Sequence, residues 1–419
     1  MATVLHRWSD NLQNRLQALA LWHSDIVMTH DFDPLQPETF DSANGEYAEL
    51  RARCPVAHSD TWGGFWALMK HADVAAAATD WQTFITSKQN VVPKVAFTGR
   101  RPPLHLDPPE HTPYRRAIAP LLTERKVAKL EPVVRRICRD LLAPMVAQGG
   151  GDVVADYSAH MPIAVFANWM NLTPDAIDEL TRVGQRYNIA VQSADMDATK
   201  ESSLLLYDMA RAIVADRKAN PLPVDEDVTS ALLATRVDGA PLPEEMIVGT
   251  IRQVLVVGII APSVMIGSIA VHLGRDQALQ AKLREDPTLV PAAVEEFLRL
   301  YTPYRGFART AVTDVTIRGR TIPAGEPIAL VYASANRDEE VFEDADQFRM
   351  GRPNMKDSLA FGRGTHSCVG AALATLELNV AVEELLAAAP GFILTGEPRP
   401  TRFPEIGALS VPIAFGRAA

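Results

Sequence analysis

One cysteine near the C-terminal end of the chain stands in a glycine-rich loop. The segment reads Phe361-Gly-Arg-Gly-Thr-His-Ser-Cys-Val-Gly370, and the Ala/Leu-rich stretch after it, from Ala371 to Leu386, is typical of a helix. A thiolate at a helix start gains from the helix dipole and from free backbone N–H groups, so we expect the pKa of Cys368 to fall. Gly362, Gly364 and Gly370 have no Cβ and would let a flat, bulky group approach the backbone. The segment therefore predicts a site that holds an anionic sulfur against something large.

The pattern Phe-Gly-x-Gly-x-His-x-Cys-x-Gly resembles the haem-thiolate signature of the cytochrome P450 superfamily. A buried structural cysteine is the usual role of a lone Cys, but it would leave the glycines, Phe361 and His366 unexplained. The resemblance implies that Cys368 is the proximal ligand of a haem b iron, with Phe361 and Gly362 beside the cofactor. A thiolate ligand pushes electron density onto iron and favours O–O cleavage.

A pair of opposite charges lies upstream of the cysteine loop. Glu296 and Arg299 are three positions apart, on one face of a helix, and Arg352 follows in Phe348-Arg-Met-Gly-Arg-Pro353. Taken alone, the Glu–Arg pair is an ordinary solvated surface pair. In the family, a Glu-x-x-Arg motif joins an arginine of such a segment in a buried network near the proximal face of the haem. The resemblance implies this structural role for Glu296, Arg299 and Arg352.

Cationic residues for the two haem propionates occur at separate places in the chain. His111 and Arg115 are one helical turn apart on one face, and by themselves they fit an ordinary basic surface helix. They match the propionate-binding helix of the family, and Arg309 and His366 match its other propionate positions. Side chains of this kind make charge-assisted hydrogen bonds to carboxylates. The resemblance thus implies cofactor binding by all four.

The charge-free segment from Val254 to Val271 departs from the family pattern. Where the family usually has an acid and an alcohol that relay protons, this chain has Ile260-Ala261-Pro262, so the catalytic residues remain unassigned. Ser263 is about 200° further round the helix than Ala261 and should face elsewhere. Because Pro262 has no N–H, we expect the carbonyl of Gly258 to lose its helical partner, the helix to bend there, and an ordered water to take over proton delivery.

The substrate pocket is expected along that segment and at two loops. Helical spacing puts Val254, Val257 and Ala261 in one apolar stripe, which ordinary core packing would also explain. The resemblance implies that these residues line the pocket. The expected lining residues are Val254, Val257, Gly258, Ala261, Phe97 in the loop 84–104, and Ile406 in the segment 403–408. Their apolar character favours a small apolar or aromatic substrate.

Helix signals dominate the sequence and would position these groups. Strand signals are confined to Phe65–Met69 and to the region from Ala308 to Val331. The expected fold class is mainly α with small β-sheets, as a single domain over residues 1–419 with residues 1–31 as an N-terminal extension. The resemblance covers roughly Phe32 to the C-terminus and implies the cytochrome P450 fold, with haem between a long distal helix and the proximal cysteine loop.

The composition restricts the environment and the partners of the chain. The 419 residues are 47% hydrophobic and 22% charged, as in a soluble globular protein, and the net charge of −10 argues against nucleic acid and anionic membranes as partners. Three cysteines are too few for a disulfide framework and fit the cytoplasm. The segment 254–271 is long enough for a membrane span, but Pro262 interrupts it and favours a buried core helix.

The resemblance implies a monooxygenase that inserts one oxygen atom from O2 into its substrate, by hydroxylation or O-dealkylation. The sequence has no Gly-rich dinucleotide fingerprint after a strand, so we expect electrons from NAD(P)H through a separate ferredoxin and ferredoxin reductase. A cluster of basic residues is the candidate docking patch, although solubilising surface charge explains most of it equally well. Its members are Arg115, Arg116, Arg125, Lys126 and Arg363.

The departure at Ile260-Ala261-Pro262 leaves other activities open. One is a peroxygenase driven by hydrogen peroxide, and another is a haem-thiolate isomerase or dehydratase that inserts no oxygen. Outside the enzymes, a haem-binding sensor or carrier has the same cofactor site. The thiolate ligand and the apolar distal segment favour an enzyme.

Overall fold

The computed structural model of the chain describes residues 31–36, 38–94 and 98–416. Residues 1–30 of the expected N-terminal extension lie outside this part, as does Phe97. The helices are α2 (Ser42–Arg53), α3 (His71–Thr79), α4 (His111–Ile118), α5 (Glu124–Val127), α6 (Glu131–Gln148), α7 (Met161–Trp169), α8 (Pro174–Gln192), α9 (Met196–Ala219), α10 (Val228–Ala234), α11 (Glu244–Val257), α12 (Ile260–Arg275), α13 (Gln277–Glu285), α14 (Val290–Leu300), α15 (Tyr332–Ala335) and α16 (Ala371–Ala387).

The strands are short and form several small sheets, as the sequence predicts, but only β2 and β7 to β10 lie in or next to the two regions with strand signals. They are β1 (Val56–Ser59), β2 (Phe65–Leu68), β3 (Phe84–Ile85), β4 (Gly150–Asp152), β5 (Arg236–Val237), β6 (Ala240–Pro241), β7 (Phe307–Ala311), β8 (Val315–Ile317), β9 (Arg320–Ile322), β10 (Pro327–Leu330), β11 (Phe392–Leu394), β12 (Arg399–Pro400), β13 (Ala408–Ser410) and β14 (Pro412–Phe415). The largest sheet has the order β1-β2-β10-β7-β3, in which β2 and β10 are parallel.

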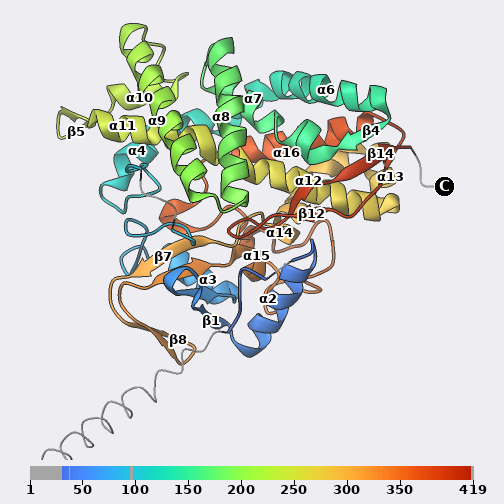
Figure 1. Cartoon of the computed structure of the whole chain (residues 1–419), viewed down its shortest axis with the longest axis horizontal. Helices are drawn as coiled ribbons and strands as arrows, with labels where there is room; N and C mark the ends of the chain where they lie inside the picture. Colours follow the sequence, from blue (N-terminus) through green and yellow to red (C-terminus); the bar gives the residue numbers. More distant parts are fainter. Residues whose placement is uncertain (1–30, 37, 95–97, 417–419) are drawn as a thin grey trace, which may run out of the picture.

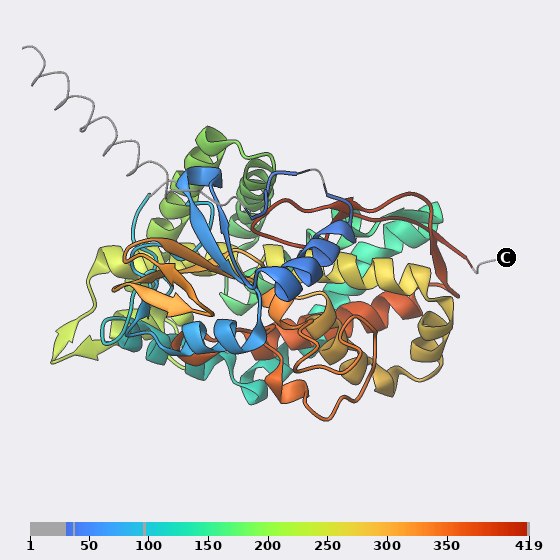
Figure 2. The same ribbon diagram turned by 90° about the horizontal axis from the view of Figure 1, so that it is seen from below.

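Two regions of different architecture meet across the molecule. Helices α6 to α12 and α16 gather on one side, and the five-stranded sheet lies with α2 and α3 on the other (Figure 1). The view from below shows α2 and α3 running beside the sheet (Figure 2). Each region has its own buried apolar cluster: the helices share a large one, and Phe65, Ala329 and Phe403 belong to a smaller one on the sheet side.

Local sequence signals set the start of the helices that matter for the site. Thr173 caps α8 by accepting the Ala176 N–H, with Pro174 in the first turn, where its missing N–H is no loss. The helix after the cysteine runs from Ala371 to Ala387, which confirms the predicted stretch. Helices α11 and α12 together form the one apolar helical segment long enough to cross a membrane in the described part, and most of its apolar window is buried in the fold.

The predicted bend at Pro262 is present as a break in that segment. Helix α11 ends at Val257 and α12 begins at Ile260. Between them Gly258 has φ −86° and ψ 0°, and the Ile259 N–H donates to the Val256 carbonyl at 3.1 Å, one residue short of the α-helical partner. Gly258 is required there, because a Cβ at this position would lie 1.9 Å from Cε2 of Phe166 on α7.

Candidate active site

The cysteine loop folds back on itself before α16. Gly362 and Gly364 have φ of +67° and +74°, which side chains rarely adopt, and a Cβ on Gly364 would lie 2.7 Å from the Ala78 carbonyl oxygen. The Cys368 N–H donates to the Phe361 carbonyl at 2.7 Å and closes the loop. The backbone conformation thus explains two of the three glycines that the sequence singled out.

The expected fall in the pKa of Cys368 is wrong for the protein without a bound metal. The protein atoms around the sulfur desolvate the thiolate and raise its pKa, against the opposing effects of the Gly370 N–H and the Arg115 charge. The N–H groups at the helix start stabilise the thiolate, but by less than its desolvation destabilises it.

The four predicted propionate-binding residues come together next to this loop. The rings of His111 on α4 and His366 have centroids 4.7 Å apart. Arg115 donates to Ser367 Oγ at 3.4 Å, one residue from the cysteine. Arg309 on β7 is buried, and its charge is the strongest ionic influence on the neighbouring His366 imidazole. Residues from two separate segments, α4 and β7, therefore meet the cysteine loop.

The donor groups in this space fit the carboxylates of a haem. Within the described residues, neither Arg115 nor Arg309 has a carboxylate within ion-pairing distance, and the buried Nε2 of His111 has no hydrogen-bond partner. Burial lowers the pKa of His111 to about 4 and that of His366 to about 3, so both imidazoles are neutral at pH 7. Guanidinium groups without a carboxylate partner and an imidazole nitrogen without a hydrogen-bond partner are suited to bind two propionates.

The predicted Glu–Arg–Arg network is formed and is buried. Glu296 Oε1 accepts from Arg299 Nη2 at 2.7 Å and from Arg352 Nε at 2.9 Å, and its Oε2 accepts from Arg299 Nε at 2.8 Å. Arg299 also donates to the carbonyl oxygens of Asn336 and Ala345, both at 2.7 Å. The network ties α14 to the segment that leads into the cysteine loop.

The apolar stripe on the broken distal helix divides into two kinds of residue. Val254 and Met265 are buried in the core, whereas the Val257 side chain is 50% exposed and Ala261 is half-buried. An exposed valine in the middle of a buried apolar segment faces open space, as a pocket residue does. Ser263 lies on another side, where its hydroxyl is 3.2 Å from Ser158 Oγ, and this confirms that it faces elsewhere.

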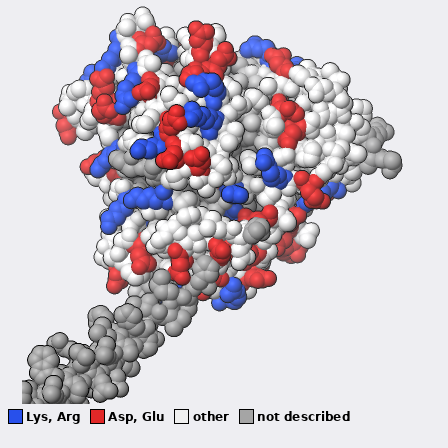
Figure 3. Space-filling view, in the orientation of Figure 1, with Lys and Arg blue, Asp and Glu red and all other residues white. Residues whose placement is uncertain are grey.

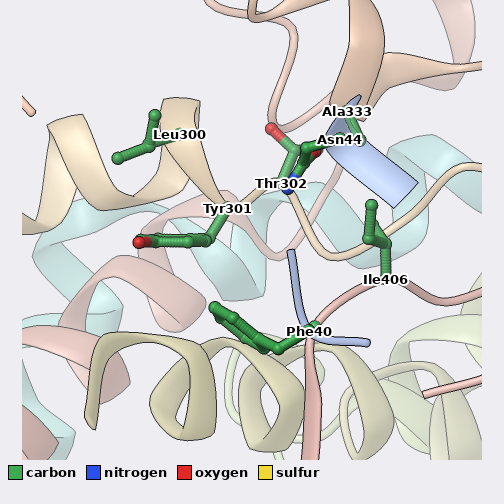
Figure 4. A pocket seen from close by; sticks show the side chains of 8 residues that line it. Phe40, Asn44, Leu300, Tyr301, Thr302, Ala333 and Ile406 are labelled. Atoms are coloured by element: carbon green, nitrogen blue, oxygen red, sulfur yellow. The ribbon is translucent and has the colours of Figure 1, made fainter. Parts of the chain in front are cut away.

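Ile406 lies in a different environment from Val257. It is buried, and with Phe40, Tyr301 and Thr302 it lines a small pocket (Figure 4). The rings of Phe40 and Tyr301 are 5.8 Å apart at its base. The Ile406 N–H donates to the Pro303 carbonyl at 3.1 Å, so the segment 403–408 pairs with the loop that leads into β7. Contact of Ile406 with a substrate remains a prediction.

Three polar residues at the site were missed by the sequence reasoning. The Tyr332 hydroxyl accepts from Arg309, and it lies 3.5 Å from the position that a Cβ on Gly362 would take. Thr86 Oγ1 is 3.3 Å from His366 Nε2, and Ser367 contacts Arg115 as described. Nothing in their local sequence marks Thr86 or Tyr332, because tertiary structure brings them there. Together, the closed cysteine loop, the cations without carboxylate partners and the buried network make up the candidate site.

Comparison with known proteins gives the same result. The sequence profile described as "Cytochrome P450" matches residues 267–390. Cytochrome P450 130 of Mycobacterium tuberculosis is 33% identical, over 87% of this chain and 93% of its own length, and the mycinamicin IV hydroxylase/epoxidase of Micromonospora griseorubida is 31% identical, over 84% and 89%. The structure of CYP109Q5 from Chondromyces apiculatus superposes with a TM-score of 0.82 at 28% identity, covering 92% of this chain and 98% of that one.

This chain belongs to the bacterial cytochromes P450. It is a haem-thiolate monooxygenase with haem b as its cofactor, and the mainly helical fold with small sheets is the fold of that family. The expectation drawn from the cysteine loop and the charged residues around it is confirmed at the level of family, fold, enzyme class and cofactor.

Proposed function

We propose that Cys368 is the iron ligand and that the enzyme hydroxylates or O-dealkylates a small apolar or aromatic substrate. The observation that carries the proposal is the convergence of His111, Arg115, Arg309 and His366 around the cysteine loop, where Nε2 of His111 has no hydrogen-bond partner. The bound haem activates dioxygen at its thiolate-ligated iron. The four cationic or imidazole side chains hold its propionates, and Phe361 and Gly362 form the backbone turn beside the thiolate.

The broken distal helix takes the place of the usual acid–alcohol pair. Pro262 has no N–H, so it cannot donate to the Gly258 carbonyl, and the ladder is interrupted at this place. We propose that this carbonyl holds an ordered water that delivers protons. Replacing Pro262 by alanine restores the N–H donor and should lengthen the helix. The expected result is more hydrogen peroxide released per NAD(P)H consumed, because poor proton delivery uncouples the reaction; unchanged coupling would contradict it.

The substrate class follows from the residues beside the break. Val257 and Ala261 are apolar and at least partly exposed, whereas the Cβ position of Gly258 is filled by Phe166. Val254 is buried in the core, so it would contact a substrate only at the edge of the apolar stripe. We propose that the pocket is apolar at this wall and admits a small ring or chain.

Electrons are proposed to come from NAD(P)H through a ferredoxin and its reductase, in the cytoplasm, with the whole chain as one domain. The docking patch is the basic surface around α4 and α5. Arg116 and Arg125 are exposed, whereas Lys126 is already paired with Asp225, with its Nζ 2.9 Å from Oδ2. Helix α5 packs against α16, which follows the cysteine, so this surface is close to the thiolate. On the face drawn in Figure 3 both signs of charge are interspersed.

A peroxide-driven peroxygenase is the second candidate. It is favoured by one observation, the apolar and proline residues at positions 260–262, which offer no acid or hydroxyl for dioxygen chemistry. Product formation with NAD(P)H, ferredoxin and reductase is compared with that from hydrogen peroxide alone. Tight coupling of NAD(P)H to product supports the monooxygenase route, and efficient turnover only with peroxide supports the second candidate.

A further inference from the structure

Two buried arginines, one on α11 of the distal helix and one in the loop before α4, have no acidic partner among the described residues. Arg252 on α11 is 1% exposed, and Arg101, in the loop before α4, is 9% exposed. Within the described part of the chain, neither side chain forms an ion pair with a carboxylate. Nε of Arg101 and both Nε and Nη1 of Arg252 lack any hydrogen-bond partner. Burying an unpaired charge is costly unless a counter-charge is supplied, so such a pair needs an explanation.

The two guanidinium groups lie close to one another in a ring of polar aromatic residues. The Arg252 guanidinium lies over the rings of Tyr187 on α8 and Tyr207 on α9, with centroids 5.2 and 5.8 Å away. Burial and then the Arg252 charge lower the pKa of Arg101. The charges of both arginines act on His105. Burial and this repulsion lower the pKa of its imidazole to about 3, and its Nε2 also has no hydrogen-bond partner. These donors therefore converge on one place.

Hydrogen bonds fix Arg252, and the loop that carries Arg101, against the neighbouring helices. Arg252 Nη2 donates to Ser203 Oγ at 2.8 Å, and the same Ser203 hydroxyl is 2.8 Å from Thr98 Oγ1. The Tyr207 hydroxyl donates to the Arg100 carbonyl at 3.3 Å. The loop is thus tied to α9 beside α11, and the unpartnered nitrogens are fixed in position.

Within the described residues no carboxylate forms an ion pair with either arginine, and the buried acid on this side is engaged elsewhere. Glu405 is the buried acid on the same side, since both it and Arg101 act on Tyr304. Its carboxylate accepts from Gln192 Nε2 at 2.7 Å, and its cationic neighbour is Arg305, not Arg101. Residues 95–97 of the same loop are Val, Ala and Phe, which carry no charge. The missing counter-charge must then come from outside the described fold.

We propose that Arg101 and Arg252 bind the carboxylate of the substrate, so that the substrate is a small aromatic or apolar organic acid. The inference rests on the proposed function and narrows its substrate class. Arg252 and the exposed Val257 are on the same helix, five residues and about 7–8 Å apart along its axis and about 140° apart around it. A ring or short chain with a carboxylate at one end spans that axial length, so its far end would lie level with the break at Gly258.

The test compares acids with their neutral isosteres on the holoenzyme. Benzoate, phenylacetate and cinnamate, and the three corresponding primary amides, are titrated by calorimetry and by the haem spin-state shift. The wild-type enzyme should bind at least one acid tightly and its amide about 10- to 100-fold more weakly. Arg101→Gln and Arg252→Gln should each remove most of that preference by lowering the affinity for the acid, while the affinity for the amide changes less than about twofold.

Two arginines in the same fold provide matched controls. Arg100→Gln removes an exposed charge from the same loop and should keep the acid preference. Arg305 is also buried but is paired with Glu38, so Arg305→Gln should lower the melting temperature. Arg252→Gln should leave the melting temperature at or above that of the wild type, because it removes an unpaired buried charge.

Four results would overturn the inference. The first two are amides that bind as tightly as the acids, and an acid preference that survives in the Arg101→Gln, Arg252→Gln double variant. The other two are a failure of every acid to bind by calorimetry, and complete displacement of the acid by inorganic phosphate at equal concentration. Amides that bind without acid preference would leave the proposed function intact. Loss of the thiolate signature of the reduced carbon monoxide complex would instead refute the proposed iron ligand, whatever the acids do.

Discussion

Glu296 is the residue on which the proximal charge network depends. Its carboxylate neutralises two buried guanidinium groups, so Glu296→Ala would leave Arg299 and Arg352 as unpaired buried charges. We expect a loss of about 3–5 kcal/mol in the free energy of unfolding, measured by denaturant titration. The exposed ion pair of Arg349 with Glu343 is the control: Glu343→Ala should cost less than about 1 kcal/mol. Equal losses in the two variants would contradict a buried network.

Glu405 should make the stability of the enzyme depend on pH. Burial raises its pKa to about 7 in the folded protein, from 4.5. The folded state therefore holds the proton more tightly than the unfolded state, and stability falls as pH rises from 4.5 to 7. The contribution of this group is about 3 kcal/mol across that interval. Glu405→Gln should flatten the curve there, measured as unfolding free energy against pH. A variant curve parallel to that of the wild type would refute this assignment.

At the scale of single residues, the sequence reasoning succeeded where a short motif holds the chemistry. Cys368, His366 and the Glu296–Arg299 pair stand in local patterns, and the resemblance of these patterns to the family predicted their grouping. It failed where burial decides the role. Neither Arg101 nor Arg252 was predicted as a site residue, although a lone arginine next to a long apolar run was an available signal for Arg252.

The break between α11 and α12 is the element whose geometry departs most from a regular helix. Phe166 packs where a Cβ on Gly258 would be, so Gly258→Ala should cost about 1–3 kcal/mol by overpacking. In a double-mutant cycle, Phe166→Leu should relieve a large part of that cost. Gly45→Ala in α2 is the control, because nothing lies within 4 Å of its Cβ position, and it should be neutral or stabilising. Additive effects of Gly258→Ala and Phe166→Leu would contradict the close packing.

At this scale the sequence predicted that the distal helix bends but not how its faces divide. Pro262 signals a lost N–H wherever it occurs in a helix, so the bend followed from chemistry alone. Which side faces the core depends on partners far away in the chain, such as Phe166 and Ser158. For this reason Val254 and Val257, equal members of one stripe in the sequence, have different environments in the structure.

At the scale of the whole molecule, an acidic protein carries a basic surface near its thiolate. Arg116→Glu and Arg125→Glu should each slow reduction by ferredoxin several-fold and weaken its salt dependence, while substrate affinity stays unchanged. Lys126→Glu should have a smaller effect, because Asp225 already neutralises Lys126. Stopped-flow reduction rates at several ionic strengths measure this. Arg211→Glu on α9 makes the same change in net charge elsewhere. An equal slowing of reduction by this variant would refute the docking surface around α4 and α5.

The identity of the iron ligand determines the chemistry of the whole enzyme. The most direct measurement is the carbon monoxide difference spectrum of the reduced holoenzyme, taken for the wild type and for three cysteine variants. We predict a thiolate-shifted band in the wild type, in Cys54→Ala and in Cys138→Ala, and its loss in Cys368→Ala. A thiolate band that persists in Cys368→Ala, or is missing from the wild type, would contradict the assignment of Cys368.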